Sequence, residues 1–202
     1  MIKNIIFDFG DVFINLDKSA TVQELSKLGN FSLTKETTTT FNLYEVGKIS
    51  TPDFITYLQS TVTKSSENEV INAWNAILLD FPSYRLDFIK QLSAEKKYNL
   101  ILLSNTNELH INWIKENVHF YEEFKSCFDS FYLSHEIHLR KPNTDIFNFV
   151  LNNNKIKASE TLFIDDTTAN TESASRLGIH IWNNDPKTED VTNLFTTKSD
   201  LF

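Results

Sequence analysis

Two carboxylates follow a run of large apolar residues near the start of the chain. The segment reads "NIIFDFGDV" (residues 4–12), so Asp8 lies among Ile and Phe side chains and Asp11 follows three residues later. A carboxylate at the end of a buried strand is costly by several kcal/mol unless a cation or hydrogen-bond donors compensate its charge. We therefore expect the fold to bring compensating groups close to Asp8.

Three further polar segments also come directly after apolar runs. They are Ser104 and Asn105 after "NLILL" (99–103), Arg140 and Lys141 in the loop after "SFYLS" (130–134), and Asp165 and Asp166 at the end of "TLFIDD" (161–166). Near-continuous apolar runs with helical patterns between them indicate a parallel sheet covered on both faces. Ligands bind beyond the carboxyl ends of the strands of such sheets. The sequence therefore predicts that the four segments meet at one crevice.

The residue types at these four strand ends suit phosphoryl chemistry. Crowded carboxylates repel one another unless a cation lies between them, and hard oxygen ligands suit Mg²⁺. Such an ion and Lys141 would hold Asp8 ionised, and an ionised carboxylate can attack the phosphorus of a phosphomonoester. Lys141 and Mg²⁺ would offset the charge of the phosphoryl oxygens, and Ser104 would donate a hydrogen bond to one of them. The product is an aspartyl-phosphate, which water then hydrolyses.

The order of the four segments resembles that of the haloacid dehalogenase superfamily of phosphohydrolases. The residues that carry the resemblance are "FDFGDV" with Asp8, "LLSNTN" with Ser104, "RKP" with Lys141 and "FIDD" with Asp165 and Asp166. The resemblance extends from residue 3 to about residue 178. The runs "LSNTNELH", "YLSHEIHLRKP" and "FIDDTTAN" are similar to the bacterial α-D-glucose-1-phosphate phosphatase branch of the superfamily.

The resemblance implies an α/β fold with a Rossmann-like parallel sheet core and a small helical cap inserted after the first strand. Helical periodicity dominates from about residue 15 to residue 82, and nothing in that block is typical of a strand. We therefore expect a core of residues 1–14 and 83–202 and a cap of residues 15–82. Helices are predicted over 144–154, from Pro82 onward, and from Asn170 or Thr171 to Gly178.

The resemblance also implies roles for individual residues. Asp8 is at the position of the nucleophile, and Asp8, the backbone carbonyl of Gly10 and Asp166 would ligate Mg²⁺. Asp165 belongs to the same metal site, where it would orient Lys141 or a water on the metal. We expect Asn105 to offer its backbone N–H to the phosphate.

One position departs from the common pattern of the superfamily. Most of its phosphatases carry a second Asp two residues after the nucleophile, which protonates the leaving oxygen and later activates water. This chain has Gly10 there and a carboxylate one residue later, at Asp11. General acid help is typically worth about 10²- to 10⁴-fold. Asp11 is therefore a candidate for acid–base catalysis or a structural residue, and we expect a slow enzyme or a good leaving group.

Four other residues are weaker candidates for substrate contact. Asn107 and His110 follow the second predicted strand, and Tyr44 and Glu45 lie in "NLYEVGKIS", a segment of the expected cap. Trp or Phe side chains of the cap are a further source of contacts with a sugar. The sequence leaves all of these open.

Composition excludes several classes of protein. The chain has 202 residues, 41% of them hydrophobic, and a formal net charge of −8, which disfavours binding to nucleic acid or to an anionic membrane. Its 4 glycines cannot supply a dinucleotide fingerprint or a P-loop, and its one cysteine, Cys127, excludes an intramolecular disulfide. We expect neither a signal peptide nor a membrane span, and hence a cytoplasmic protein, either monomer or homodimer.

The leading hypothesis is a Mg²⁺-dependent phosphatase that acts on a small phosphorylated metabolite, with a sugar phosphate favoured. A 2-haloacid dehalogenase uses the same nucleophile without metal, but it tends to have an aromatic residue where Gly10 stands and does not need the acidic pair. A non-catalytic ligand-binding protein on the same scaffold is the other alternative, because the usual general acid is missing.

Overall fold

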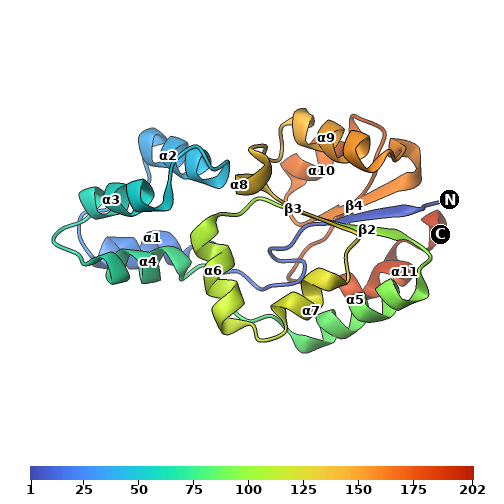
Figure 1. Ribbon diagram of the computed structural model, residues 1–202, viewed down its shortest axis with the longest axis horizontal. Helices are drawn as coiled ribbons and strands as arrows, with labels where there is room; N and C mark the ends of the chain where they lie inside the picture. Colours follow the sequence, from blue (N-terminus) through green and yellow to red (C-terminus); the bar gives the residue numbers. More distant parts are fainter.

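The computed structural model describes residues 1–202 and contains one five-stranded parallel sheet (Figure 1). The strands are β1 (Asn4–Phe7), β2 (Asn99–Ser104), β3 (Ser130–Leu133), β4 (Thr161–Asp165) and β5 (His180–Asn183). Their order across the sheet is β3-β2-β1-β4-β5, and each neighbouring pair is parallel. This arrangement confirms the predicted α/β fold with a Rossmann-like parallel sheet.

The central strand β1 is covered on both of its faces. Successive side chains of a strand point to opposite faces of the sheet. Ile5 and Phe7 belong to the large apolar cluster on one face, and Ile6 belongs to a separate cluster on the other. All three side chains are fully buried. The double burial explains why the sequence of β1 is continuously apolar instead of alternating.

Helices pack against both faces of the sheet. They are α5 (Ser83–Glu95), α6 (Glu108–Asn117), α7 (Tyr121–Ser126), α8 (Ser134–Ile137), α9 (Thr144–Asn154), α10 (Thr168–Ser175) and α11 (Leu194–Thr197), with 3₁₀ turns at Ala158–Glu160, Val191–Asn193 and Ser199–Leu201. Helices α9 and α10 cover one face, and α5, α7 and α11 cover the other (Figure 1). The sheet is therefore the middle of three layers.

Aromatic rings fill the layer between the sheet and helices α5 and α7. The ring centroids of Phe13 and Phe124 are 4.9 Å apart, and those of Phe81 and Phe124 are also 4.9 Å apart. Phe9, directly after Asp8, stacks on Phe124 at 5.2 Å. Each such pair contributes roughly 0.5–1.5 kcal/mol beyond its buried area. These rings anchor the segment that carries Asp8.

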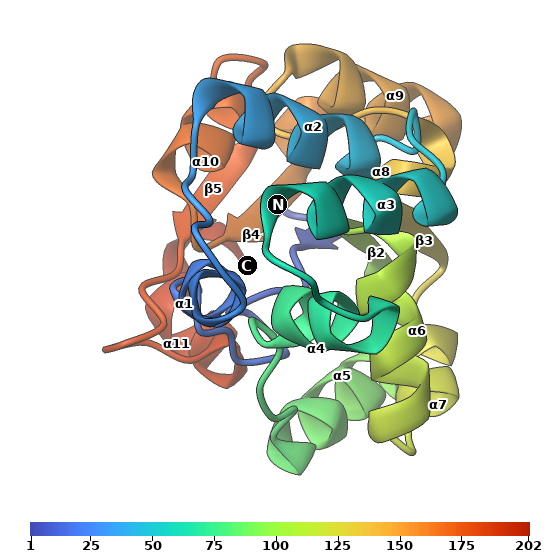
Figure 2. The same cartoon turned by 90° about the vertical axis from the view of Figure 1, so that its left-hand side faces the viewer.

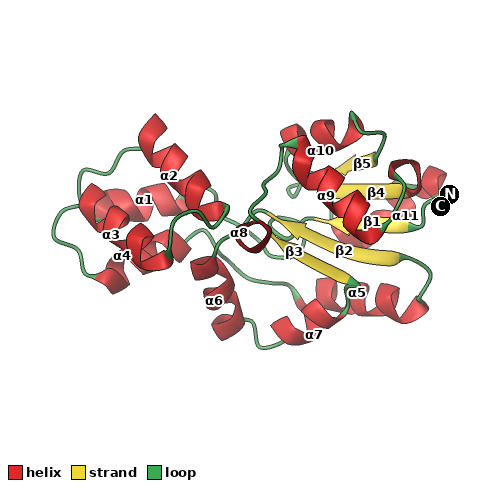
Figure 3. Cartoon of the chain, turned by 45° about the horizontal axis from the view of Figure 1, so that its top comes forward, coloured by secondary structure: helices red, strands yellow, loops and turns green.

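Four helices between β1 and α5 form a separate body, the cap, beyond the carboxyl ends of the strands (Figure 3). They are α1 (Ala20–Lys27), α2 (Lys35–Glu45), α3 (Thr51–Thr61) and α4 (Glu67–Asn75). The cap has its own apolar cluster, which includes Leu25, Phe54 and Trp74. The predicted helical cap inserted after the first strand is thus confirmed.

The two chain segments that join cap and core run side by side. The backbone N–H of Leu79 donates to the carbonyl of Asn15 at 3.0 Å, and the N–H of Asp17 donates to that of Ile77 at 2.9 Å. These antiparallel contacts lie close to both ends of the expected cap, residues 15–82. The division at these residues stays a prediction.

Some predicted boundaries differ from the structure. Helix α10 begins at Thr168, two residues before the earlier of the two predicted starts. Its first turn is fixed by Asp165, which accepts hydrogen bonds from the N–H of Thr167 and the side chain of Asn170. Helix α10 ends at Ser175, before the predicted end at Gly178, and Gly178 has the expected left-handed conformation, with φ of 83°. Across the whole chain, every helix is too short or too polar to cross a membrane.

Candidate active site

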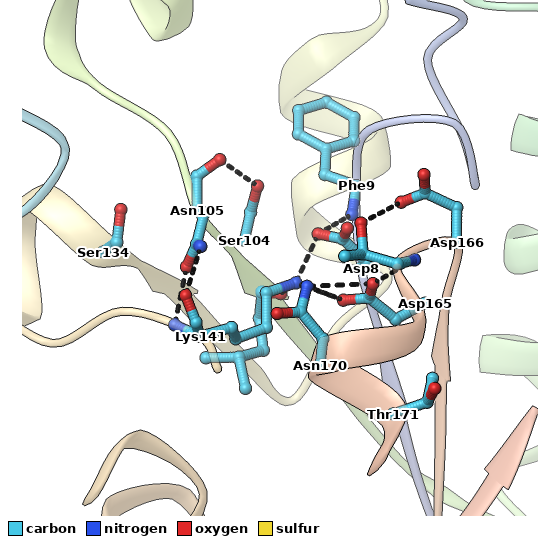
Figure 4. A network of polar contacts seen from close by, with 12 residues as sticks. Asp8, Phe9, Ser104, Asn105, Ser134, Lys141, Asp165, Asp166, Asn170 and Thr171 are labelled. Carbon is cyan, nitrogen blue, oxygen red and sulfur yellow. Dashed lines mark hydrogen bonds and ion pairs between the residues drawn. The ribbon is translucent and has the colours of Figure 1, made fainter. Parts of the chain in front are cut away.

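Asp8 and Lys141 form a buried ion pair at the carboxyl end of the sheet (Figure 4). Nζ of Lys141 lies 2.7 Å from Oδ1 of Asp8, and the lysine side chain is only 1% exposed. Asp8 directly follows β1, and Lys141 lies in the loop between α8 and α9. The same Oδ1 accepts the N–H of Phe9 at 2.7 Å, so two donors fix the orientation of the carboxylate.

Lys141 also binds two groups from the neighbouring strands. Its Nζ lies 2.7 Å from Oδ2 of Asp165 and donates to the carbonyl of Leu103 at 2.9 Å. An ammonium has three donors, and Asp8, Asp165 and Leu103 take all of them. Burial alone would lower the pKa of Lys141, but the charges of Asp165 and Asp8 outweigh it and raise that pKa. Lys141 is therefore a fixed positive charge.

The charge of Asp8 is only partly compensated by the chain. Burial raises the pKa of Asp8 to about 7; Lys141 opposes this rise and Asp165 adds to it. A divalent cation beside Asp8 would favour the ionised carboxylate. Lys141 alone therefore does not fully compensate the negative charge at this site, and a second cation would stabilise it.

The two carboxylates at the end of β4 lie in different surroundings. Asp165 is fully buried and accepts hydrogen bonds from Lys141, from the N–H of Thr167 and, with both oxygens, from Nδ2 of Asn170 at 3.0 Å. Asp166 instead lines the cavity and is paired with Lys18. Asp165 is therefore saturated by the chain, and Asp166 is the more available of the two.

The donor set at this point fits a hard divalent cation. Asp8, Asp165 and Asp166 each bring a carboxylate oxygen within 4.8 Å of the others. Gly10 also lines the cavity, and its carbonyl oxygen accepts no hydrogen bond from the chain. Carboxylate and carbonyl oxygens are the ligands that Mg²⁺ takes in proteins. The structure thus brings together all four residues predicted for the metal.

Above these groups lies a cavity of about 310 Å³ between the sheet and the cap. Its floor includes Asp8, Ser104, Asn105 and Lys141. Apolar side chains close part of the wall, among them Ile14, Leu16, Ile77, Leu78 and Ile114. The volume is at the small end of the range for ligand sites, roughly 300–1,000 Å³. The cavity therefore suits a small metabolite.

Asn105 has separate uses for its side chain and its backbone. The side-chain amide donates to the carbonyl of Lys141 and accepts the N–H of Lys141, each at 2.9 Å. Its backbone N–H has no acceptor on the chain, and the same holds for the N–H of Gly10. Ser104, 3% exposed, has only a 3.5 Å contact with the carbonyl of Asn105. Three donors at the cavity floor are thus available to an anion.

Asp11 lies apart from this cavity. It has a left-handed backbone, with φ of 54°, which turns its side chain back toward the linker. Oδ1 accepts the N–H of Leu16 at 3.0 Å, and Oδ2 lies 3.0 Å from Nζ of Lys18. These contacts stabilise the turn that leads from β1 into the cap, and the structure does not bring Asp11 to the cavity lining.

Asn107 and His110 connect the core to the cap. Oδ1 of Asn107 accepts from the indole N–H of Trp74 at 3.2 Å, so the amide NH₂ faces Nδ1 of His110 at 3.1 Å. We assign the ring proton of His110 to Nε2, which lies 3.4 Å from the carbonyl of Trp74. Burial lowers the pKa of His110 to about 4. Its ring faces the cavity with both nitrogens in use.

Two residues of the site, Lys18 and Asn170, were not among the candidates from the sequence. Lys18 lies in the first linker to the cap and pairs with both Asp11 and Asp166. Asn170 holds both oxygens of Asp165. An Asn at the start of α10 could have been found from its spacing to the strand end, since a first-turn side chain points back toward the preceding loop. The position of Lys18 depends on the turn at Asp11, and no spacing in the sequence indicates it.

Comparison with known proteins decides the family. The model of haloacid dehalogenase-like hydrolases matches residues 2–178. The chain belongs to this family. It is therefore a hydrolase, as the four segments predict, and the expected resemblance is confirmed.

Relatives in the family include a phosphatase and magnesium-bound structures. D-ribitol-5-phosphate phosphatase of Bacteroides thetaiotaomicron is 35% identical in an alignment of 188 positions, which covers 88% of this chain and 89% of that protein. A haloacid dehalogenase family enzyme of the same organism, crystallised as a magnesium complex, is 34% identical with a TM-score of 0.86 over 96% of this chain and 98% of its own. A complex of that enzyme with magnesium and inorganic phosphate has 33% identity, a TM-score of 0.82, and coverage of 96% and 100%.

Proposed function

We propose that the protein is a Mg²⁺-dependent phosphatase that hydrolyses a small sugar or polyol phosphate through an aspartyl-phosphate at Asp8. The chain is a phosphoric monoester hydrolase of the haloacid dehalogenase-like family. The observation that carries the proposal is the buried contact of Asp8 with Lys141, at 2.7 Å, beside two further carboxylates.

The phosphate group of the substrate binds at the cavity floor. Lys141 offsets its negative charge, and the hydroxyl of Ser104 and the N–H groups of Gly10 and Asn105 donate to its oxygens. These donors are fixed before the substrate arrives, so they stabilise the charge that spreads over the phosphoryl oxygens in the transition state at little reorganisation cost.

Asp8 then acts as the nucleophile. A bond forms between a carboxylate oxygen of Asp8 and phosphorus, the ester P–O bond breaks, and the leaving alcohol oxygen takes a proton from water. Water attacks the aspartyl-phosphate, which regenerates the carboxylate of Asp8 and releases phosphate. Lys141 remains charged throughout because Asp165 holds it.

Asp8, Gly10 and Asp166 would hold the metal ion, with Asp165 orienting Lys141 beside them. When bound, Mg²⁺ neutralises the phosphoryl oxygens and favours the ionised nucleophile. The expected acidic cluster is present, whereas dehalogenase chemistry has no need of it. The observation therefore favours the phosphatase over the 2-haloacid dehalogenase.

The substrate class follows from the relatives and the cavity. The phosphatase relative is named for D-ribitol 5-phosphate, a polyol phosphate. A cavity of about 310 Å³ admits a substrate of that size. The expectation of a sugar phosphate is consistent with both, and the narrower expectation, the glucose-1-phosphate phosphatase branch, stays a prediction.

Turnover of p-nitrophenyl phosphate with and without metal tests the proposal. We expect activity with Mg²⁺ that is lost in EDTA and restored by added Mg²⁺. A panel of sugar and polyol phosphates, assayed by phosphate release, then identifies the substrate. Activity that persists in EDTA would refute the metal assignment, and a protein inactive on every phosphate ester would be a binding protein on this scaffold.

A further inference from the structure

Glu45 is the one cap helix residue that lines the cavity. It is the last residue of α2, and the other lining residues from the cap segment, Leu16, Lys18, Ile77 and Leu78, belong to the two linkers. Its neighbour Tyr44 points the other way, into the apolar cluster of the cap, where its ring stacks on Phe54 at 3.9 Å. Of the two cap residues that the sequence left open, only Glu45 therefore faces the reaction site.

The end of α2 is fixed against the core at α8 (Figure 2). Oγ of Ser134 lies 2.6 Å from the carbonyl of Glu45, and Nδ1 of His138 lies 2.9 Å from the carbonyl of Val46. Gly47 has a φ of 65°, and a Cβ there would meet the carbonyl oxygen of His135 at 2.3 Å. The close approach requires glycine. Glu45 is thus held in place before a substrate binds.

Arg140 uses only one of the two carboxylate oxygens of Glu45. Its Nε and Nη2 lie 3.2 and 2.9 Å from Oε2, and no group of the chain donates to Oε1. The side chain of Glu45 is 26% exposed, and the charge of Lys141 reaches it. One oxygen of an oriented carboxylate is therefore left to accept hydrogen bonds at the cavity.

The surroundings indicate what this oxygen can bind. Among the other lining residues, His110 has both ring nitrogens engaged. The linkers contribute three apolar side chains and one cation, Lys18, which is already paired with Asp11 and Asp166. A second phosphate or a carboxylate would be repelled by Glu45, whereas hydroxyl groups would donate to it. Each hydrogen bond to a charged group is worth roughly 10- to 100-fold in binding.

We infer that Glu45 determines specificity by accepting hydrogen bonds from hydroxyl groups of the substrate, and that the enzyme selects polyhydroxylated phosphates over alkyl phosphates of equal length. Arg140 is its positioning residue. This inference rests on the proposed function, since it assigns to Glu45 the binding of the leaving group in the same cavity. The phosphate is bound at the floor, and the hydroxyl groups are bound by the cap.

Two substrates of equal chain length separate the hydroxyl contribution from the rest of binding. The test measures kcat/KM for D-ribitol 5-phosphate and for n-pentyl phosphate, with p-nitrophenyl phosphate as reference. We expect the wild type to prefer the polyol by more than about tenfold. Glu45→Gln should lower kcat/KM for the polyol roughly tenfold and Glu45→Ala roughly 100-fold, the range expected from the loss of one to two charged hydrogen bonds.

Activity on pentyl phosphate and p-nitrophenyl phosphate should stay within about threefold in both variants. Glu36→Gln, an exposed carboxylate in the first turn of the same helix, is the matched control and should change nothing. The inference is overturned if the wild type does not prefer the polyol, or if the variants lose activity equally on all three substrates, which would indicate a structural role. A wild type inactive on all three would refute the proposed function itself.

Discussion

Lys141 lies at the same distance, 2.7 Å, from a carboxylate oxygen of Asp8 and from one of Asp165. Asp8 directly follows β1, and Asp165 is the last residue of β4. These two strands are neighbours in the sheet. One buried ammonium thus connects the proposed nucleophile, Asp8, to Asp165, both of whose oxygens already accept hydrogen bonds from the chain. The charge of Asp165 holds Lys141 protonated, and the positive charge of Lys141 then acts on Asp8 and on the phosphate.

Removal of this ammonium should affect both activity and stability. We expect Lys141→Met to lower kcat/KM for p-nitrophenyl phosphate by roughly 10²- to 10³-fold, because one fixed charge at the phosphoryl oxygens is lost. The variant leaves two buried carboxylates side by side, so added Mg²⁺ should raise its melting temperature more than that of the wild type. Lys141→Met activity within threefold of the wild type would contradict the assigned role.

Asp165 and Asp166 should respond differently to the same Asp→Asn change. Asp166→Asn is expected to weaken Mg²⁺ binding more than about tenfold by isothermal titration calorimetry, with little change in stability, since Asp166 lines the cavity. Asp165→Asn leaves Lys141 short of a buried counter-charge and should lower the free energy of unfolding by about 3 kcal/mol in urea. Equal effects of the two variants on both measurements would show that the division of roles is wrong.

His110 should make stability depend on pH. Burial lowers its pKa from 6.5 to about 4, so the ring stays neutral in the fold while the unfolded chain binds a proton below pH 6.5. The free energy of unfolding therefore falls as pH drops below 6.5. From pH 7.5 to 5 we expect this residue to contribute a loss of roughly 1–2 kcal/mol, discounted because the ring is partly open to the cavity.

Urea denaturation at the two pH values measures this contribution. His110→Gln should show a smaller loss of stability between pH 7.5 and 5 than the wild type. His119→Gln, at an exposed histidine, should behave as the wild type does. If His110→Gln loses as much stability as the wild type over this range, then the buried imidazole is not the cause.

The sequence was most informative where the pattern was local and repeated. The helix predicted over 144–154 has the observed bounds of α9, because Ile146, Phe147 and Val150 fall on one buried face. The strand ends were also readable, since parallel strands expose their carboxyl ends at the same edge. That rule, applied together with the loop that follows the third predicted strand, brought Asp8 and Lys141 together from positions more than a hundred residues apart.

Contacts that depend on a turn or on the placement of the cap were not predictable. Lys18 reaches Asp166 only because the left-handed turn at Asp11 directs the linker across the cavity. Tyr44 and Glu45 are adjacent, and the periodicity of α2 does not say which of them meets the core. The contact of α2 with α8 settles this, and it joins residues about 90 positions apart that share no sequence signature.

The most direct test of the whole account is the activity of Asp8→Asn. The change keeps the size of the side chain and removes the nucleophilic charge, and circular dichroism with the melting temperature verifies that the variant is folded. We predict that kcat/KM for p-nitrophenyl phosphate with saturating Mg²⁺ falls by at least ~10³-fold relative to the wild type. A folded Asp8→Asn protein that retains more than a tenth of wild-type activity would contradict the account.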